Sequence, residues 1–124
     1  MEIDINKVRK ALLDLHSVLL NYQKHEYELS NKSITNPNEY FGLVTNHPDF
    51  KWLRVISELI VSIDESIENN EGLNIKDLLA YTTKTLFEGE KSGVFETNYN
   101  KAIKQDANVA LAHSRLKELL HNLE

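Results

Sequence analysis

The chain of 124 residues contains no cysteine, only four glycines and two prolines, and no long apolar run. The lack of cysteine excludes disulfides, thiolate metal sites and cysteine nucleophiles. No segment approaches the roughly 20 apolar residues that cross a bilayer. The acidic start, Met1 to Asp4, does not have the pattern of a signal peptide. We therefore expect a cytoplasmic protein that does not bind membranes.

Positive charge is also scarce. The chain has 19 acidic and 14 basic side chains, which gives a net charge of −5. Its three arginines, Arg9, Arg54 and Arg115, are far apart in the sequence. A negative balance repels phosphate backbones, and nucleic-acid-binding proteins normally carry a basic stripe. We expect no nucleic-acid partner.

What the sequence does have is helical periodicity. Apolar residues recur at every third or fourth position between the few glycines and prolines, which is typical of amphipathic helices. The pattern predicts an all-α, compact helical bundle of about six helices, four long and two short, in a single domain over residues 1–124. The first helix is expected to reach about Asn31. The most apolar one extends from Pro48 to about Ile67, and these two helices are expected to pair antiparallel in the core.

Helix boundaries are indicated by capping residues. Asn36 is placed to cap a short helix, and Asp106 is placed to cap the last one. Asn74 is expected to cap a third long helix, which Gly89 would close. A further short helix is predicted after Gly93.

Five polar residues occupy positions where the periodicity calls for apolar ones. These are His16, Glu26, Ser57, Asp64 and His113. Burying a polar group costs about 1 to 3 kcal/mol unless it finds a partner. We expect a buried hydrogen-bond network in which Asp64 or Ser57 accepts from one of the two histidines. In this network Glu26 reaches an arginine.

The same residues allow a second interpretation. His16, Asp64 and His113 supply donor atoms for a divalent metal or a polar ligand held between helices, and Glu26 would lie nearby. Ser57 could complete a serine triad, but a serine in the middle of a helix lacks the sharp turn and the oxyanion hole that a nucleophile needs. We therefore expect no catalytic residue, no metal and no cofactor.

Aromatic residues mark the start of the central helix. Phe50 and Trp52 lie on different faces of this predicted helix. Together with Arg54 they would form an anchor for a protein partner. The alternative, which is more usual for aromatic residues at this spacing, is that both belong to the core.

The segment at 50–65, with sequence FKWLRVISELIVSIDE, resembles the centre of small all-helical bacterial proteins of unassigned function. The resemblance implies a compact bacterial helical domain. It implies no activity. Its distinctive residues are Trp52, Arg54, Ser57 and Asp64.

The second half resembles a tetratricopeptide unit. The residues at that spacing are Leu79, Leu86, Gly89, Phe95, Tyr99 and Ala102, followed by Ala112, His113 and Leu116. The chain departs from the motif at Thr83, Lys117 and Ala107, and only one and a half units fit, whereas arrays need about three. The resemblance implies a helix hairpin with a break near Asp106.

The breadth of the first helix's apolar arc suggests a function. Leu13, Leu20 and Tyr27 widen the arc, so that one neighbouring helix cannot cover it. The leading hypothesis is a non-enzymatic domain that binds a protein partner or self-associates, with a homodimer as the simplest form. The competing hypothesis is the metal- or small-molecule-binding bundle described above.

Overall fold

The computed structural model describes residues 5–68, 72–87 and 93–121, with side chains except at 72–76. These residues form seven helices and no strand, which confirms the all-α prediction. The helices are α1 (Ile5–Ser30), α2 (Pro37–Asn46), α3 (Pro48–Lys51), α4 (Arg54–Glu68), α5 (Gly72–Phe87), α6 (Val94–Gln105) and α7 (Ala107–His121). In the part of the chain that is described, no helix is both long and apolar enough to span a membrane.

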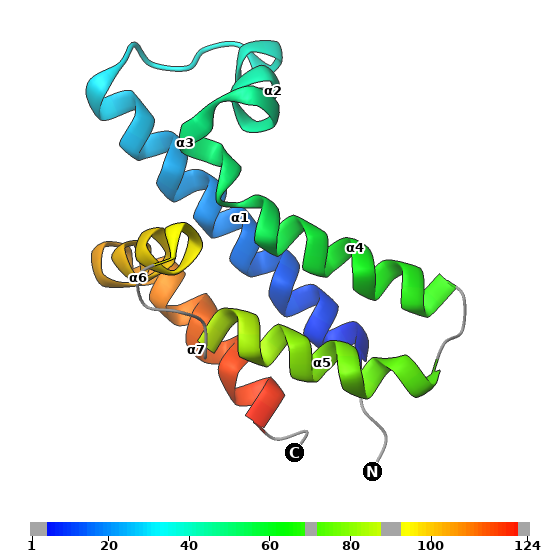
Figure 1. The fold of residues 1–124 in the computed structure, drawn as a ribbon. Helices are drawn as coiled ribbons and strands as arrows, with labels where there is room; N and C mark the ends of the chain where they lie inside the picture. Colours follow the sequence, from blue (N-terminus) through cyan, green and yellow to red (C-terminus); the bar gives the residue numbers. More distant parts are fainter. Residues whose placement is uncertain (1–4, 69–71, 88–92, 122–124) are drawn as a thin grey trace.

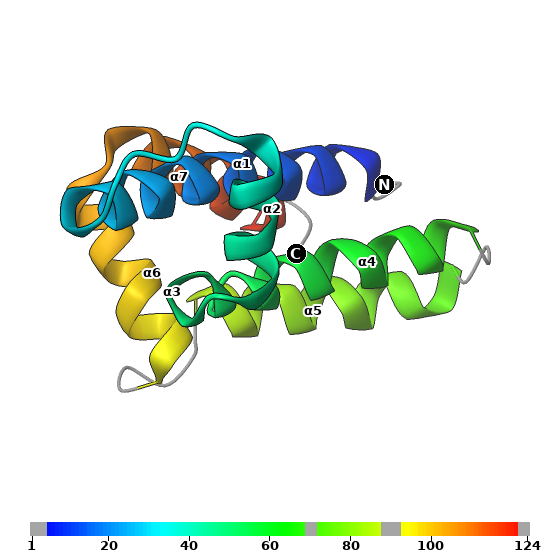
Figure 2. The same cartoon turned by 90° about the horizontal axis from the view of Figure 1, so that it is seen from above.

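The four longest helices form two layers (Figures 1 and 2). Helices α1 and α7 make one layer, and α4 and α5 make the other. Helix α4 runs antiparallel to α1, as predicted, and α6 crosses between the layers to connect α5 with α7. The sequence did not indicate that α7, rather than α4, is the more extensive neighbour of α1.

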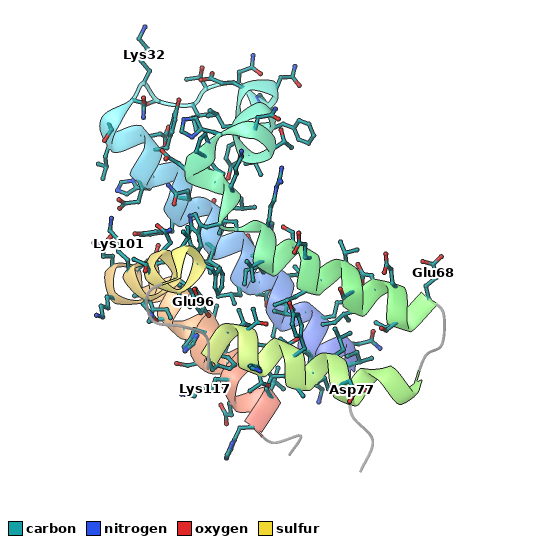
Figure 3. The ribbon with its side chains drawn as sticks, in the orientation of Figure 1. Lys32, Glu68, Asp77, Glu96, Lys101 and Lys117 are labelled. Atoms are coloured by element: carbon teal, nitrogen blue, oxygen red, sulfur yellow. The ribbon has the colours of Figure 1, made fainter. Side chains whose placement is uncertain are left out.

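The core follows the predicted periodicity. Val8, Leu12, Leu15 and Leu19 of α1 are fully buried at three- and four-residue spacing. Buried side chains of α1 and of α3 to α7 belong to one hydrophobic cluster. Charged side chains such as Lys32 and Glu68 point away from the bundle (Figure 3). Burial of one stripe on each helix therefore holds the two layers together.

The seventh helix arises because the predicted helix from Pro48 to Ile67 is divided into α3 and α4. At the division, the N–H of Leu53 donates to the carbonyl oxygen of Phe50 at 3.2 Å. The N–H of Ile56 donates to the carbonyl oxygen of Leu53 at 3.1 Å. These bonds span three residues, as in a tight 3₁₀ turn, so the chain changes direction without a glycine or proline.

Two predicted caps are confirmed. Asn36 Oδ1 accepts from the N–H of Asn38 at 2.7 Å at the start of α2. Asp106 Oδ1 accepts from the N–H groups of Asn108 at 2.8 Å and Val109 at 3.3 Å, at the predicted break between α6 and α7. A side-chain oxygen at this position satisfies amide groups that have no partner within the helix.

The predicted cap at Asn74 is wrong. Helix α5 already begins at Gly72, so the backbone at Asn74 is helical, whereas a capping residue has non-helical dihedral angles. Gly89, which was expected to close this helix, lies outside the described residues.

Candidate functional site

The five polar residues predicted to lie inside the bundle are all half-buried. They do not gather at one place. The described part of the chain contains no group of three or more histidine, aspartate or glutamate side chains that could hold a metal ion. Only His16 and Ser57 contact each other, and Asp64, Glu26 and His113 each have a separate local setting.

His16 of α1 contacts Ser57 of α4. The distance between His16 Nε2 and Ser57 Oγ is 3.0 Å. Burial lowers the pKa of His16, because the charged ring is poorly solvated there. The neutral ring is thus favoured, and one pair of the predicted network is present in the structure.

Asp64 has a different partner from the one predicted. It accepts a hydrogen bond from Arg9 Nε and forms an ion pair with it, in place of a histidine. Arg9 lies seven residues before His16, and Asp64 lies seven residues after Ser57. Since α1 and α4 are antiparallel, this spacing places the two contacts two helical turns apart along the same pair of helices.

The Ser57 contact is consequently not a triad. Asp64 is about 10 Å further along α4, at 1.5 Å per residue, and is bonded to Arg9 instead of His16. Ser57 also lies inside a regular helix, where backbone N–H groups are bonded within the helix and form no oxyanion hole.

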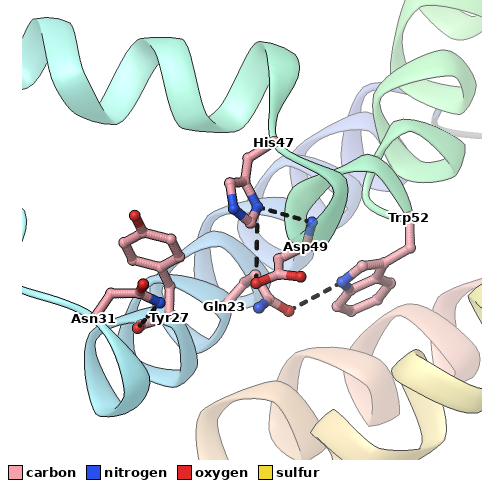
Figure 4. Close-up of polar contacts among 6 residues, drawn as sticks. All are labelled: Gln23, Tyr27, Asn31, His47, Asp49 and Trp52. Atoms are coloured by element: carbon pink, nitrogen blue, oxygen red, sulfur yellow. Dashed lines mark hydrogen bonds and ion pairs between the residues drawn. The ribbon is translucent and has the colours of Figure 1, made fainter.

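A third contact follows at the next seven-residue step along α1. Trp52 Nε1 donates to Gln23 Oε1 at 3.0 Å (Figure 4). We call the three contacts Arg9–Asp64, His16–Ser57 and Gln23–Trp52 the polar seam. Sequence reasoning missed two of its α1 members, although residues 9, 16 and 23 share one helix face at a spacing that matches that of Ser57 and Asp64.

Beyond the seam, α3 is anchored to the last turns of α1 (Figure 4). His47 Nδ1 accepts from the N–H of Asp49 at 3.1 Å and caps α3. The edge of the Tyr27 ring packs on the His47 ring, with centroids 5.3 Å apart and planes at 85°. These contacts explain the position of α3 and bring no further reactive group to the seam.

His113 of α7 contacts Tyr99 of α6. The distance between Tyr99 Oη and His113 Nδ1 is 2.6 Å. Burial raises the pKa of Tyr99 well above its usual range, and it lowers the pKa of His113, with a smaller contribution from Lys117. The hydroxyl therefore stays protonated and the ring stays neutral, and the two groups share one hydrogen bond. His113 is satisfied by a tyrosine and not, as predicted, by Ser57 or Asp64.

Glu26 does not reach an arginine. In the described residues no ion pair involves Glu26, and two of the arginines have other partners: Arg9 bonds Asp64, and Arg54 Nη2 donates to the carbonyl oxygen of Thr45 at 3.1 Å. The Glu26 charge instead acts on Tyr22. Burial raises the pKa of that phenol most, and Glu26 adds to the increase.

The aromatic anchor predicted for a partner is part of the core. Phe50 is 1% exposed and Trp52 is 7% exposed, while Arg54 alone remains at the surface. The Phe50 ring of α3 packs near Tyr27 of α1, with centroids 6.1 Å apart. Of the two interpretations of these aromatic residues, the structure bears out the more usual one, that both belong to the core, and not the partner anchor.

Large apolar side chains are nevertheless exposed elsewhere. They are Leu13, Leu29, Phe41, Val61, Ile67, Tyr81, Val94 and Leu111. Leu13 lies on α1 between the first two contacts of the polar seam, four residues after one and three before the other. Val61 lies in the same way on α4. Because residues three and four apart share a helix face, the two side chains lie on the outer side of the seam. We call Leu13 and Val61 the apolar window.

Comparison with family models, with curated proteins and with solved structures finds no match for this chain.

Proposed function

We propose that this chain is a non-enzymatic helical interaction domain, which acts by binding a protein partner or a second copy of itself. The observation that carries this proposal is the apolar window. Leu13 is 38% exposed and Val61 is 52% exposed. The helices that carry them are packed together, and the Arg9–Asp64 and His16–Ser57 contacts bring the two residues to similar heights along the pair. Apolar residues that adjoin on a surface, unlike single scattered ones, are typical of interaction sites.

The polar side chains also favour an interaction domain over a ligand-binding one, because they have partners within the bundle. Each histidine on an apolar face has its own partner, Ser57 for His16 and Tyr99 for His113. No buried side-chain nitrogen or oxygen atom in the described residues lacks a partner. Satisfied groups of this kind fix how helices pack and leave no donor atom directed at a ligand.

The arrangement gives no support to the metal- or ligand-binding alternative. His16, Asp64 and His113 lie in three different contacts, on three different helices. A metal site needs its ligands to converge on one point at about 2 Å from the ion. We therefore do not propose this second function.

The proposal can be tested by comparing two matched substitutions. Val61→Glu introduces a charge into the apolar window, and Leu111→Glu introduces one at an aliphatic residue on α7 with a similar exposure of 50%. Both sites are exposed and lie inside helices, so circular dichroism should show an intact fold for both variants. Light scattering after size-exclusion chromatography and affinity capture with mass spectrometry then measure association.

We expect Val61→Glu, and not Leu111→Glu, to lose self-association or to lose specific captured proteins. A wild-type chain that is strictly monomeric, with a captured set that neither substitution changes, would contradict the proposal.

A further inference from the structure

We infer that the apolar window forms the centre of a two-fold dimer interface, in which α1 of one copy packs on α4 of a second copy. The inference deepens the proposed function, on which it rests, by naming the partner and the orientation. It depends on three features of the α1–α4 face, namely its charges, their heights along the helices and the extent of the open surface.

The two sides of the window carry opposite charges. On α1, the exposed Lys10 lies three residues before Leu13. On α4, the exposed residues Glu58 and Glu65 lie three residues before and four residues after Val61. Residues at these spacings share one side of a helix. Arg54, seven residues before Val61, is also exposed, so the α4 side carries two acids and one base and is acidic on balance, while Lys10 makes the α1 side basic. A second copy offers a surface with the same division of charge.

The sign of the charge does not change if the neighbouring acid on α1 is included. Asp14, which follows Leu13, lines the groove between α1 and α7 together with Val18 and Arg115. Asp14 lies four residues after Lys10, on the side of that residue that faces α7, and is therefore farther from the window than Lys10.

The heights of these charges along the helices select one orientation. Lys10 follows Arg9, and Glu65 follows Asp64, so both charges lie level with the Arg9–Asp64 ion pair. A two-fold axis parallel to the helices keeps every residue at its height and places α1 opposite the partner's α4. Lys10 of each copy then faces Glu65 of the other, and Leu13 faces Val61. An axis perpendicular to the helices would place α1 on α1, with like charges opposed.

The open part of this face has a defined end. Tyr40 of α2 packs over α1, where its hydroxyl lies 3.5 Å from the carbonyl oxygen of Leu20 and the Lys24 ammonium lies 5.4 Å from its ring centroid. Tyr40 therefore covers the outer face of α1 around Leu20 and Lys24, which limits the open face to the earlier turns of α1 beside α4.

The size of the open face predicts a weak dimer. Helix α4 has 15 residues and is thus about 22 Å long, and two adjacent helices are roughly 20 Å wide. The footprint of roughly 450 Å² per copy is smaller than the roughly 800 Å² of a standard stable interface. We expect a concentration-dependent dimer that salt weakens, because part of its specificity comes from exposed ion pairs.

Cysteine cross-linking tests the orientation directly, because the natural chain has no cysteine. Leu13→Cys and Val61→Cys are prepared separately, mixed and oxidised mildly, with Leu111→Cys as the control. We expect the mixed Leu13–Val61 disulfide to form several times faster than either homodimer, and the control to form no pair with either. If disulfides between two copies of the Leu13→Cys variant form faster than the mixed disulfide, the two-fold axis is not parallel to the helices. The proposal that the chain self-associates would still stand.

Charge reversal gives a second, independent test. Lys10→Glu and Glu65→Lys each place two repelling pairs in their own dimer, so each should weaken dimerisation about tenfold. A mixture of the two variants restores attraction at both pairs, and its dissociation constant should return to within about threefold of the wild-type value. Sedimentation at low and high salt measures all four samples.

The outcomes separate this inference from the proposed function. If the mixture of Lys10→Glu and Glu65→Lys dimerises as weakly as each variant alone, the inference is wrong. A wild-type chain that remains monomeric at millimolar concentration overturns it as well, while capture of proteins that depends on Val61 would still support an interaction domain with a different partner.

Discussion

The polar seam between α1 and α4 differs in kind from the corner where α5, α6 and α7 meet. The seam consists of single polar contacts at seven-residue steps along α1. The corner consists of packed rings: the His113 ring lies 4.9 Å from that of Phe87 and 5.3 Å from that of Tyr99, which in turn stacks 5.3 Å from Phe95. The seam connects helices that are distant in the sequence, whereas the corner connects three consecutive helices, and the two regions do so by different physical means.

The difference lies in how much surface each region removes from water. Arg9 and Asp64 keep 41% and 44% of their side chains exposed, while Tyr99 is 1% exposed. Buried aromatic area stabilises a fold strongly, whereas exposed ion pairs contribute little. The corner should therefore hold the bundle together, and the seam should mainly fix the register in which α1 and α4 pair.

Truncation in the corner should have the largest effect. Phe95→Ala removes a buried ring that contacts Trp52, with centroids 6.1 Å apart, and should lower the free energy of unfolding by about 3 to 5 kcal/mol. Denaturant unfolding followed by the fluorescence of the single tryptophan measures this loss. Val94→Ala, at the exposed neighbouring residue, serves as the control and should change the free energy by less than about 0.5 kcal/mol. A loss below 1 kcal/mol for Phe95→Ala would show that the corner is not the stabilising region.

The hydroxyl of the corner should contribute less than its rings. Tyr99→Phe keeps the ring and removes the hydroxyl that bonds His113 Nδ1, so we expect a loss of about 1 kcal/mol in the free energy of unfolding. A double-mutant cycle with His113→Ala isolates the contact, because the two substitutions should not be additive. Full additivity would mean that the 2.6 Å contact contributes no free energy of its own.

The pH dependence compares the two regions within one experiment. Burial lowers the pKa of His16 in the seam and of His113 in the corner. The unfolded chain therefore binds protons more readily than the folded chain. The contribution of these histidines to the free energy of unfolding is fully present above pH 6.5, the ordinary histidine pKa. It is lost as the pH falls from there toward the lower pKa values of the two rings in the folded chain. A protonated His16 can still donate to Ser57, so its loss reflects the burial of charge and not a broken bond.

Unfolding experiments at pH 7.5 and 5.5 measure this dependence. His16→Gln and His113→Gln should each flatten the difference between the two pH values, and His25→Gln, at an exposed histidine, should leave it unchanged. An acid loss that persists unaltered in both of the first two variants would assign the effect to other groups.

The two regions also show what could be predicted from the sequence. The burial of Leu12 and Leu15 and the cap at Asp106 depend on local spacing, and these predictions are confirmed. The partners of Asp64 and His113 depend on which helices become neighbours and in which register, and no local pattern specifies this. Of the predicted contacts the structure therefore contains Ser57–His16, whereas Asp64, His113 and Glu26 have neighbours that the sequence did not indicate.

The sequence contains one indication of the seam, namely the seven-residue spacing of polar residues, but it does not show which two helices pair. The seven-residue spacing of Ser57 and Asp64 required a matching pair on another helix, and Arg9 and His16 provide it. The burial of Trp52 was among the sequence-based interpretations, but the position from which it is buried could not be anticipated. It follows from a turn between α3 and α4 that contains neither glycine nor proline.

The smallest effect is expected for the ion pair of the seam. Arg9→Ala and Asp64→Ala should show a coupling energy of about 0.2 to 1 kcal/mol in a double-mutant cycle, and 0.5 M salt should reduce it, because both side chains are more than one-third exposed. The cycle is needed because Arg9→Ala alone also removes the packing of the aliphatic stem. A coupling energy above about 2 kcal/mol that salt does not change would show that the seam stabilises the fold as the corner does, because only an ion pair shielded from water has that strength. A weak, salt-sensitive coupling would leave the seam with the role of setting register, and would keep its outer face available for the second copy.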